Sequence, residues 1–574
     1  MVDFFGFFDG GNHMARTVGI GIQNFEKMIK SNYFYVDKTS FIKEWWESGD
    51  DVTLITRPRR FGKSLNMSMI ETFFSVEYAD RAELFEGLSV FEEEKYRMLQ
   101  GTYPVIFLSF ANIKEVDFKT TRKKICQMIA ELYSRYDFLT EDETCKEGDR
   151  EYYHRINPQM DDADASMSVH YLTKLMYQYY GRKVIILLDE YDTPMQEAYV
   201  NGYWEELVSF TRSLFNSTFK TNPYLERGLM TGITRVSKES IFSDLNNPAV
   251  VTTTTNRYTD AFGFTEQEVF DALDEYGYDD RKEEVRSWYD GFIFGRQKDI
   301  YNPWSMINFL KTGEIETYWA NTSGNGLVSK LLRSGSGKLK DQFERLMRGE
   351  NIYCPIDEQI IYNQLDNDED AIFSLLIASG YLKVISLEKK EAGKPRMYEL
   401  ALTNGEVMDM FYGMVRGWFS GAKGDYNDFI QALLAGNVKE MNVYMNNVAL
   451  KTFSYFDTGR DASEVRKPEK FYHGFVLGLI VDLAGEYIIT SNRESGLGRY
   501  DVMIEPMDSK KDAFILEFKV HDPDEENTLE DTLASAHAQI EEKQYEAALA
   551  ARGICAEHIH KYGFAFEGKK VLIG

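Results

Sequence analysis

The stretch from Val52 to Ser64 reads VTLITRPRRFGKS, a β-branched run followed by a basic turn that ends in Gly62-Lys63-Ser64. A helical pattern begins at Ser64, so the turn stands between a strand and a helix. In this context the backbone N–H groups of the turn and the helix N-terminus bind phosphate oxygens. We expect Lys63 to reach the β- and γ-phosphates of a nucleotide, and the Ser64 hydroxyl to bind Mg²⁺.

The basic turn departs from the usual phosphate-binding loop at its first position, where Arg57 replaces a glycine. Arginine lacks the wide backbone freedom of glycine, although the added positive charge favours phosphate. The residues predicted to bind the nucleotide are Arg57, Arg59, Arg60, Phe61, Gly62, Lys63, Ser64 and Leu65, joined by Asp189 and Arg235 from later in the chain.

A second apolar run, Ile185–Leu188, ends in the carboxylates Asp189 and Glu190. On a strand beside the loop, Asp189 would hold Mg²⁺ and Glu190 would activate the attacking water. Asp192 could share either role. The alternative is that the two carboxylates merely cap a strand.

Arg235 follows a third apolar strand, Gly228–Ile233. A charged residue at such a strand end can report on the γ-phosphate, and an ordinary strand-to-loop arginine is the alternative. Together with Val105–Leu108, these apolar runs alternate with helical patterns. Continuous apolar strands separated by helices predict an α/β fold whose parallel sheet is covered on both faces.

The middle of the chain changes character. The pattern is helical over Thr265–Leu310, with interruptions at Tyr289-Asp290-Gly291 and Asn302-Pro303, and indicates a helical lid. A basic helical stretch, Ser329–Arg348, is interpreted as a solvated helix face. A helix over Ala371–Tyr381 precedes two strand-like runs, Tyr381–Leu387 and Met397–Leu402, which is the order of a winged-helix module. Any α+β connector would give the same order.

Near the C-terminus, Asp501 and the run Glu517-Phe518-Lys519 occupy two strands that a polar turn joins into a hairpin. Because side chains alternate along a strand, Glu517 and Lys519 share one face. Asp501 and Glu517 are hard oxygen ligands that suit Mg²⁺, and a lysine beside them can help to deprotonate a water that attacks a phosphodiester. Mutual ion pairing of these buried charges is the alternative. The helix expected next runs from Thr528 to Ala551.

Composition limits the remaining possibilities. The 574 residues are 43% hydrophobic and 14% aromatic, which supplies packed cores. No apolar run approaches the length of a membrane-spanning helix, and the start lacks the basic leader of a signal peptide. The four dispersed cysteines favour a reducing cytoplasm. The formal charge of −27 is unusual for a protein that coats DNA, so nucleic acid would have to bind local basic patches.

At this point the residues as a set match a known family. The chain resembles, over nearly its whole length, AAA-ATPase-like proteins that carry a C-terminal PD-(D/E)XK nuclease domain. The matching motifs are YVDKT at 35–39, RPRRFGKS at 57–64, LDEYD at 188–192, GITRVS at 232–237, FGFT at 262–265, WYDG at 288–291, YNPWS at 301–305, FYHG at 471–474, residues 495–501, and EFK at 517–519. Arg57 in place of glycine is the family's own form.

The resemblance implies roles for individual residues. It implies that Asp501 and Glu517 bind the metal and that Lys519 is the catalytic lysine. Glu469 would match the helix carboxylate of the nuclease superfamily, and Gln539 a polar helix residue that supports the site.

With the resemblance, the sequence predicts five parts. These are a possible extension (1–14), a P-loop ATPase domain (15–264), a helical lid (265–350), a winged-helix-like connector (351–440) and an α/β restriction-endonuclease-like domain (441–574). The leading hypothesis is an enzyme that binds and hydrolyses ATP and couples it to a Mg²⁺-dependent nuclease, with DNA as the favoured substrate and defence against phage or mobile DNA as a role.

The rival hypothesis is a regulatory or signalling ATPase whose C-terminal domain only binds a partner or nucleic acid. A third possibility is a nucleotide site that binds ATP but barely turns it over. Assembly into a homo-oligomer is left open, because no residue identifies a subunit interface.

Overall fold

The computed structural model divides the chain into two compact units, Met1–Leu327 with Tyr353–Val407, and Val328–Ile352 with Met408–Gly574. The structure describes residues 15–235, 248–320, 326–334, 337–347, 349–357, 368–387, 396–419, 426–452, 486–491, 501–508, 510–523, 526–567 and 570–574, and the single positions 362, 365, 476, 480, 483, 494, 495, 498 and 499. The five-part division of the sequence stays a prediction.

The first unit contains a five-stranded parallel sheet in the order β2-β3-β4-β1-β5. Its strands are β1 (Val52–Thr56), β2 (Val105–Ser109), β3 (Val184–Asp189), β4 (Leu225–Gly232) and β5 (Ala249–Val251). The four predicted strands are confirmed, and β5 is added at one edge. Every residue of β1 and β3 is buried, because helices cover both faces of the sheet.

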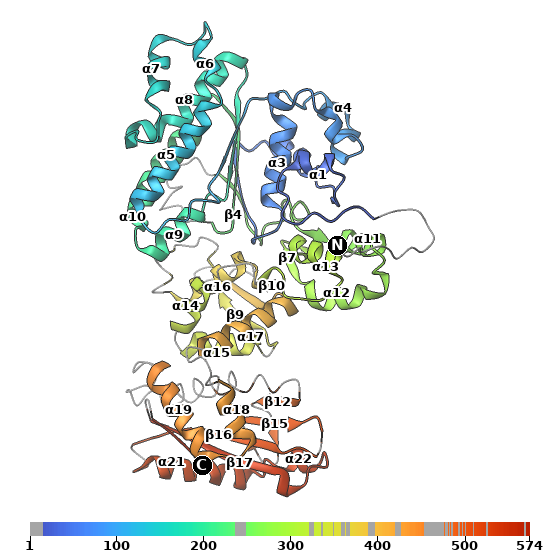
Figure 1. Ribbon diagram of the computed structural model, residues 1–574, viewed down its shortest axis with the longest axis vertical. Helices are drawn as coiled ribbons and strands as arrows, with labels where there is room; N and C mark the ends of the chain where they lie inside the picture. Colours follow the sequence, from blue (N-terminus) through green and yellow to red (C-terminus); the bar gives the residue numbers. More distant parts are fainter. Residues whose placement is uncertain are drawn as a thin grey trace, which may run out of the picture. The chain divides into compact units, whose positions relative to one another are not determined.

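The covering helices come from both sides of the sheet. Figure 1 shows α3 (Lys63–Phe74) on one face and α5 (Phe118–Ser134), α8 (Asp162–Tyr180) and α10 (Trp204–Phe219) on the other. The shorter helices of this part are α1 (Phe25–Lys30), α2 (Ser40–Glu47), α4 (Glu94–Arg97), α6 (Phe138–Glu141), α7 (Glu147–Arg155) and α9 (Thr193–Asn201). Because the strands are parallel, the ends of β1, β3 and β4 meet at one edge of the sheet.

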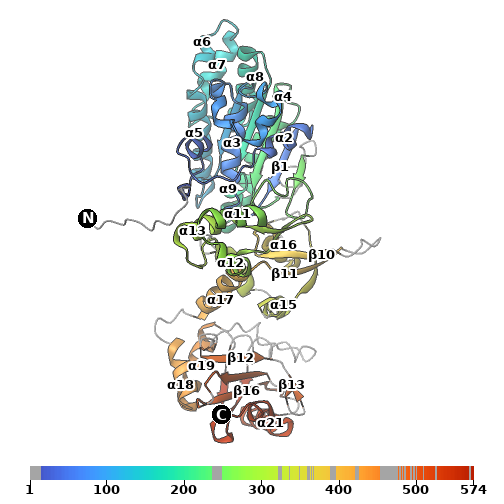
Figure 2. The same cartoon turned by 90° about the vertical axis from the view of Figure 1, so that its right-hand side faces the viewer.

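A small helical region follows the sheet and contains α11 (Glu266–Glu275), α12 (Lys282–Tyr289) and α13 (Pro303–Thr312). The three helices lie together in Figure 2 and share an apolar core. A three-stranded sheet of β6 (Phe264–Thr265), β8 (Gln297–Tyr301) and β7 (Phe292–Phe294) accompanies them. The predicted helices are confirmed, but the strands were missed because they are only two to five residues long.

The connector contains α16 (Glu369–Ala378) and the hairpin of β10 (Leu382–Leu387) and β11 (Met397–Leu402), with β9 (Ile352–Pro355) on the outer side of β11. The predicted helix and hairpin are therefore confirmed. The basic stretch Ser329–Arg348 forms two helices, α14 (Gly326–Ser334) and α15 (Gly337–Met347), where the sequence suggested one helical segment.

The second unit is built on a mixed sheet in the order β12-β15-β16-β17-β18. The strands are β12 (Tyr487–Ser491), β15 (Val502–Pro506), β16 (Ala513–Val520), β17 (Ile559–Glu567) and β18 (Lys570–Ile573), and β13 (Glu494–Ser495) pairs with β14 (Gly498–Arg499) beside it. Only β16 and β17 pair in parallel within the large sheet. The predicted hairpin of β15 and β16 is confirmed.

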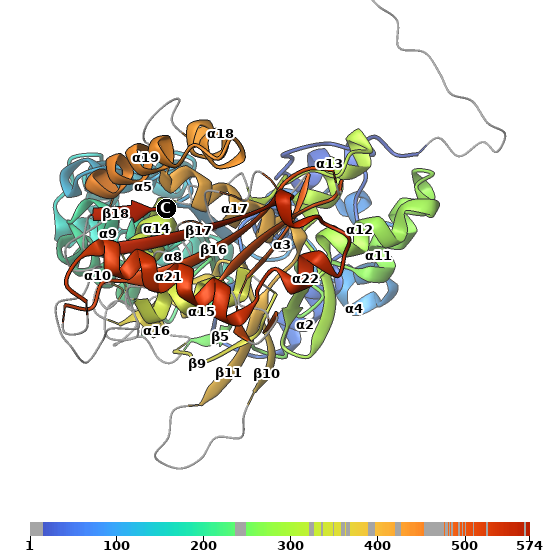
Figure 3. The ribbon, with the colours of Figure 1, turned by 90° about the horizontal axis from the view of Figure 1, so that it is seen from below.

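Helices cover both faces of the mixed sheet. Figure 3 shows α18 (Tyr426–Leu434) and α19 (Val438–Thr452) on one side and α21 (Leu529–Lys543) on the other. Phe514, Leu516 and Phe518 pack with α18 and α19. Ala513 and Ile515 pack with Ile540 of α21. The odd-numbered residues of β16 therefore face α21. The remaining helices are α17 (Gly405–Phe419) and α22 (Ala547–Ala550).

The predicted helix Thr528–Ala551 is confirmed as far as Lys543, but a break at 544–546 separates it from the short helix α22. Helix α21 ends at Lys543, because Gln544 adopts a left-handed backbone conformation with φ of 51°. The chain then places Tyr545 in the core before α22 begins. No proline or glycine marks this break, so the periodic apolar pattern hid it.

Two asparagine side chains cover the exposed edge of the mixed sheet. Asn442 donates to the Ile573 carbonyl (2.7 Å) and accepts from the Ile573 N–H (2.8 Å). Asn446 makes the same pair of bonds with Val571 (2.7 and 3.0 Å). Each amide thus replaces a neighbouring strand, which protects β18 from pairing with another chain.

We expect Asn442→Ala and Asn446→Ala each to leave two backbone groups of β18 without these bonds. The loss corresponds to about 1–3 kcal/mol of local stability, so amides of β18 should exchange with deuterium roughly tenfold faster or more. The control is Val443→Ala on the exposed face of the same helix. Equal exchange in all variants would contradict the edge-covering role.

Candidate active sites

The ends of β1, β3 and β4 bring together the predicted nucleotide-binding residues. The Ser64 hydroxyl donates to Oδ2 of Asp189 (2.7 Å), and the Thr231 hydroxyl donates to Oδ1 of the same carboxylate (2.6 Å). Asp189 is buried, and burial raises its pKa. A hydroxyl and a carboxylate oxygen in contact at this edge have the chemistry of a Mg²⁺ site.

Lys63 closes the phosphate-binding loop on itself. Its ammonium donates to the carbonyl oxygens of Arg57 (2.9 Å) and Pro58 (2.8 Å), and burial lowers its pKa. Gly62, with φ of 80°, and Arg60, with φ of 66°, give the loop its left-handed turns before α3. These two bonds hold the Lys63 ammonium within the loop, and its contact with the β- and γ-phosphates stays a prediction.

Arg57 supports the loop from behind. Its guanidinium donates to four main-chain carbonyls, those of Thr56 (2.9 Å), Thr252 (2.9 Å), Arg257 (3.2 Å) and Tyr258 (3.2 Å). The side chain is fully buried, and burial lowers its pKa to about 9. A guanidinium engaged in this way holds the loop through main-chain carbonyls, and the expected contact between Arg57 and phosphate stays a prediction.

The Arg57→Lys variant should be less stable, because the three N–H donors of an ammonium cannot bond four carbonyls that are arranged around a planar guanidinium. We expect a decrease of about 2–3 kcal/mol in the free energy of unfolding, measured by urea denaturation. Arg59→Lys is the matched control, since the Arg59 side chain is partly exposed and donates to Gln196 (3.1 Å). Equal stability of the two variants would refute the supporting role.

Among the other side chains of the loop, the arginines are at the surface and the phenylalanine is buried. The Arg60 guanidinium is exposed and lies 4.2 Å from the centre of the Trp304 ring. Phe61 is buried against Phe292 and Phe294, at ring-centre distances of 4.8 and 5.3 Å. Leu65 is half-buried in the first turn of α3. Arg59 and Arg60 therefore keep the positive charge at the loop surface.

Glu190 and Asp192 differ in what they contact. Glu190 has φ of 50° and accepts a hydrogen bond from the Thr193 hydroxyl (3.0 Å). Asp192 Oδ2 accepts from the N–H groups of Ile233 (3.0 Å) and Thr234 (2.7 Å) and from the Thr234 hydroxyl (2.7 Å). Asp192 thus fixes the loop after β4 through Oδ2, and the metal or base role considered from the sequence stays a prediction. Arg235 follows this loop and is half-buried.

In the second unit, the face of β16 toward α21 carries the predicted nuclease residues. Glu517 is buried and accepts a hydrogen bond from the Gln539 amide of α21. Lys519 lies on the same strand face and is half-buried. Helix α21 therefore places the Gln539 side chain beside Glu517, the position that the resemblance implies for it.

Asp501 lies across from Glu517, at the start of the neighbouring strand. It directly precedes β15, and the pairing of Val502 with Leu516 sets Asp501 opposite Glu517 in the antiparallel register. Oδ2 of Asp501 accepts from the Phe518 N–H (2.9 Å). The structure thus brings together two carboxylates from adjacent strands, with Lys519 two residues along from Glu517.

Tyr545 belongs to this cluster and was not predicted. Its hydroxyl accepts from the Gln539 amide (3.1 Å), which also holds Glu517. Burial, and then the charges of Glu517 and Asp501, raise the pKa of Tyr545 to about 12. No local sequence signal marks Tyr545, because it reaches the site through the unexpected end of α21. Glu469 lies outside the described residues.

Each of the two sites offers few protein oxygen ligands, which is enough for a metal ion that keeps most of its bound water. Among the residues that the structure describes, no three His, Cys, Asp or Glu side chains form a metal-binding group. Mg²⁺ is commonly held by one or two carboxylates, water and substrate phosphates, and Asp501 with Glu517, or Asp189 with Ser64, supplies that number of protein oxygens. In the same part of the chain, no helix has the length and apolar character needed to cross a membrane.

Comparison with known proteins agrees with this geometry. Residues 19–242 match the family described as a predicted AAA-ATPase, and residues 467–574 match the PD-(D/E)XK nuclease superfamily. The chain is also 26% identical, over 397 residues, to an uncharacterized protein from the vnfD 5′ region of Azotobacter chroococcum mcd 1. That alignment covers 68% of each chain.

Proposed function

We propose that this chain, which joins a predicted AAA-ATPase domain to a C-terminal domain of the PD-(D/E)XK nuclease superfamily, is an ATPase whose nucleotide state controls a Mg²⁺-dependent nuclease. The observation that carries the nuclease assignment is the pair of carboxylates, Asp501 and buried Glu517, on adjacent strands beside Lys519. Burying a negative carboxylate costs free energy unless a positive charge lies beside it. A metal ion that also binds the substrate phosphate would supply that charge.

In the ATPase site, the chain would act mainly by positioning charge. Lys63 would bind the β- and γ-phosphates, and Ser64 with Asp189 would hold Mg²⁺. Glu190 would accept a proton from the attacking water. The remaining residues proposed to contact the nucleotide are Arg59, Arg60, Phe61, Gly62, Leu65 and Arg235.

In the nuclease site, a bound Mg²⁺ would stabilise the charge that develops on the phosphodiester. Asp501 and Glu517 would hold the metal, and Gln539 would fix the orientation of the Glu517 carboxylate. Lys519 would orient the attacking water and favour its deprotonation. Tyr545 would orient Gln539 in turn.

DNA is the proposed substrate, and defence against phage or mobile DNA is the proposed role. The parts of the chain would be a P-loop domain at 15–264, a helical lid at 265–350, a winged-helix-like connector at 351–440 and a restriction-endonuclease-like domain at 441–574, after a possible extension at 1–14. We further propose a cytoplasmic location and leave assembly into a homo-oligomer as an option for the ATPase.

The test is incubation of the full chain with DNA and Mg²⁺, with and without ATP. The wild type should degrade DNA, and Asp501→Ala and Lys519→Ala should not. Glu505→Gln is a matched control, because Glu505 is a buried carboxylate of the same sheet that pairs with Arg552. A wild type that leaves DNA intact, or variants that cleave as well as the wild type, would remove the nuclease proposal.

The second candidate is a regulatory ATPase whose C-terminal domain binds without cutting. The formal charge of −27 favours it, because the chain as a whole repels phosphate backbones. Retention of DNA or a partner by both wild type and Lys519→Ala, without cleavage by either, would select this candidate.

A further inference from the structure

The main chain of the phosphate-binding loop is anchored by residues far away in the sequence. The carbonyl oxygen of Arg59 accepts hydrogen bonds from the Trp319 indole N–H (2.9 Å) and from the Asn302 side-chain amide (3.3 Å). Asn302 is the N-cap of α13, and both donors are buried. Two fixed donors therefore set the direction of one carbonyl in the middle of the loop.

Fixing this carbonyl also fixes the next N–H group. In a trans peptide the C=O and the following N–H point in opposite directions, so the Arg60 N–H is turned away from Asn302 and Trp319. Arg60 and Gly62 are both in left-handed conformations, with φ of 66° and 80°. Successive N–H groups around such residues form a concave site for anions.

One buried carboxylate holds both segments that supply the donors. Glu406 accepts from the Trp319 backbone N–H (2.6 Å) and, through both oxygens, from the Ser305 hydroxyl (3.1 and 2.9 Å). Ser305 lies in the first turn of α13, three residues after the Asn302 cap. Glu406 lies in the first turn of α17, which runs from Gly405 to Phe419.

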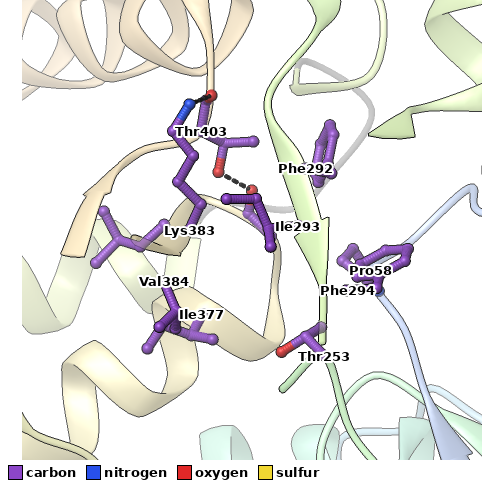
Figure 4. A pocket seen from close by; sticks show the side chains of 11 residues that line it. Pro58, Thr253, Phe292, Ile293, Phe294, Ile377, Lys383, Val384 and Thr403 are labelled. Atoms are coloured by element: carbon purple, nitrogen blue, oxygen red, sulfur yellow. Dashed lines mark hydrogen bonds between the residues drawn. The ribbon is translucent and has the colours of Figure 1, made fainter. Parts of the chain in front are cut away.

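Apolar packing supports the same arrangement. The Trp319 ring lies 5.3 Å from Phe292 and 5.6 Å from Tyr381, centre to centre. Figure 4 shows Pro58, Phe292 and Phe294 on one side of a small pocket that Ile377, Lys383 and Val384 line from the connector. Gly380 is needed here, because a Cβ at that position would lie 2.8 Å from the Pro58 ring. The back of the loop is thus in contact with the connector.

We propose that Trp319, Asn302 and Glu406 are positioning residues for the nucleotide. They orient the Arg59–Arg60 peptide so that the Arg60 N–H is presented to phosphate, although none of the three contacts the ligand. The inference rests on the proposed nucleotide site. It adds that the ability of this loop to bind phosphate depends on the lid and the connector, because their side chains hold the carbonyl oxygen of Arg59 in place.

The test compares the affinity of the full chain for Mg²⁺-ATP and for tripolyphosphate by titration calorimetry. Trp319→Phe keeps an aromatic ring and removes the donor, and Asn302→Asp keeps the α13 cap acceptor and removes the donor. Each should bind both ligands about tenfold more weakly, by the same factor for each ligand, because the effect is on phosphate.

Trp45→Phe is the matched control. Trp45 is fully buried in the same unit, and its indole N–H has no hydrogen-bond partner among the described residues. Trp45→Phe should bind both ligands like the wild type, even though its melting temperature should fall as much as that of Trp319→Phe or more. If Trp319→Phe also binds like the wild type while the wild type binds ATP, the positioning role is wrong and the nucleotide site stands. If the wild type binds neither ligand, both proposals fail.

Discussion

Glu517→Gln should abolish DNA cleavage, with a decrease of roughly 100-fold or more in rate. The substitution keeps the size of the side chain and its bond with Gln539, but removes the negative charge that the metal requires. Glu517 is buried and held by Gln539, so the substitution changes the charge at a fixed position in the sheet.

The measurement is the initial rate of plasmid degradation at saturating Mg²⁺, with the melting temperature recorded for each variant. Glu505→Gln again serves as the control for removing a buried carboxylate from this sheet. Its rate should be close to that of the wild type even if its stability is lower. Cleavage by Glu517→Gln at the wild-type rate would exclude the metal-binding role.

Lys63→Ala should eliminate both nucleotide binding and ATP hydrolysis, whereas Glu190→Gln should retain binding and lose hydrolysis by roughly 100-fold or more. The difference follows from position. Lys63 is buried within the loop and in the proposed site would supply the charge that holds phosphate, while Glu190 follows Asp189 at the end of β3 and would act on water.

Phosphate release and ATP affinity, measured on the same preparations, separate these two effects. Lys174→Ala is the control, because Lys174 is a partly buried lysine on α8 that pairs with Asp149 (2.6 Å). Hydrolysis by Lys63→Ala at the wild-type rate would leave the site without a catalytic role.

The sequence was sufficient to place the strand ends that form the proposed ATPase site. Parallel strands buried on both faces are continuous apolar runs, and their ends meet at one edge of the sheet. Ser64 and Asp189 are therefore found in contact, as their positions after β1 and in the last residue of β3 suggest. The β15–β16 hairpin was predictable for a similar reason, since a short polar turn joins two apolar runs.

The role of Arg57 could not be predicted in the same way. Its carbonyl partners, apart from that of Thr56, lie about two hundred residues further along the chain. The roles of Trp319 and Asn302 could not be predicted either, because their bonds to the Arg59 carbonyl oxygen depend on how the helical region packs on the loop. Tyr545 was missed for a local reason, the left-handed turn at Gln544.

The central claim, that nucleotide state controls cleavage, is tested most directly by one measurement. DNA degradation with Mg²⁺ is followed in the presence and absence of ATP for the wild type and Lys63→Ala, with Lys519→Ala as the inactive reference. We expect ATP to change the wild-type rate, Lys63→Ala to cleave at one rate in both conditions, and Lys519→Ala not to cleave. A wild-type rate that is the same with and without ATP would contradict it.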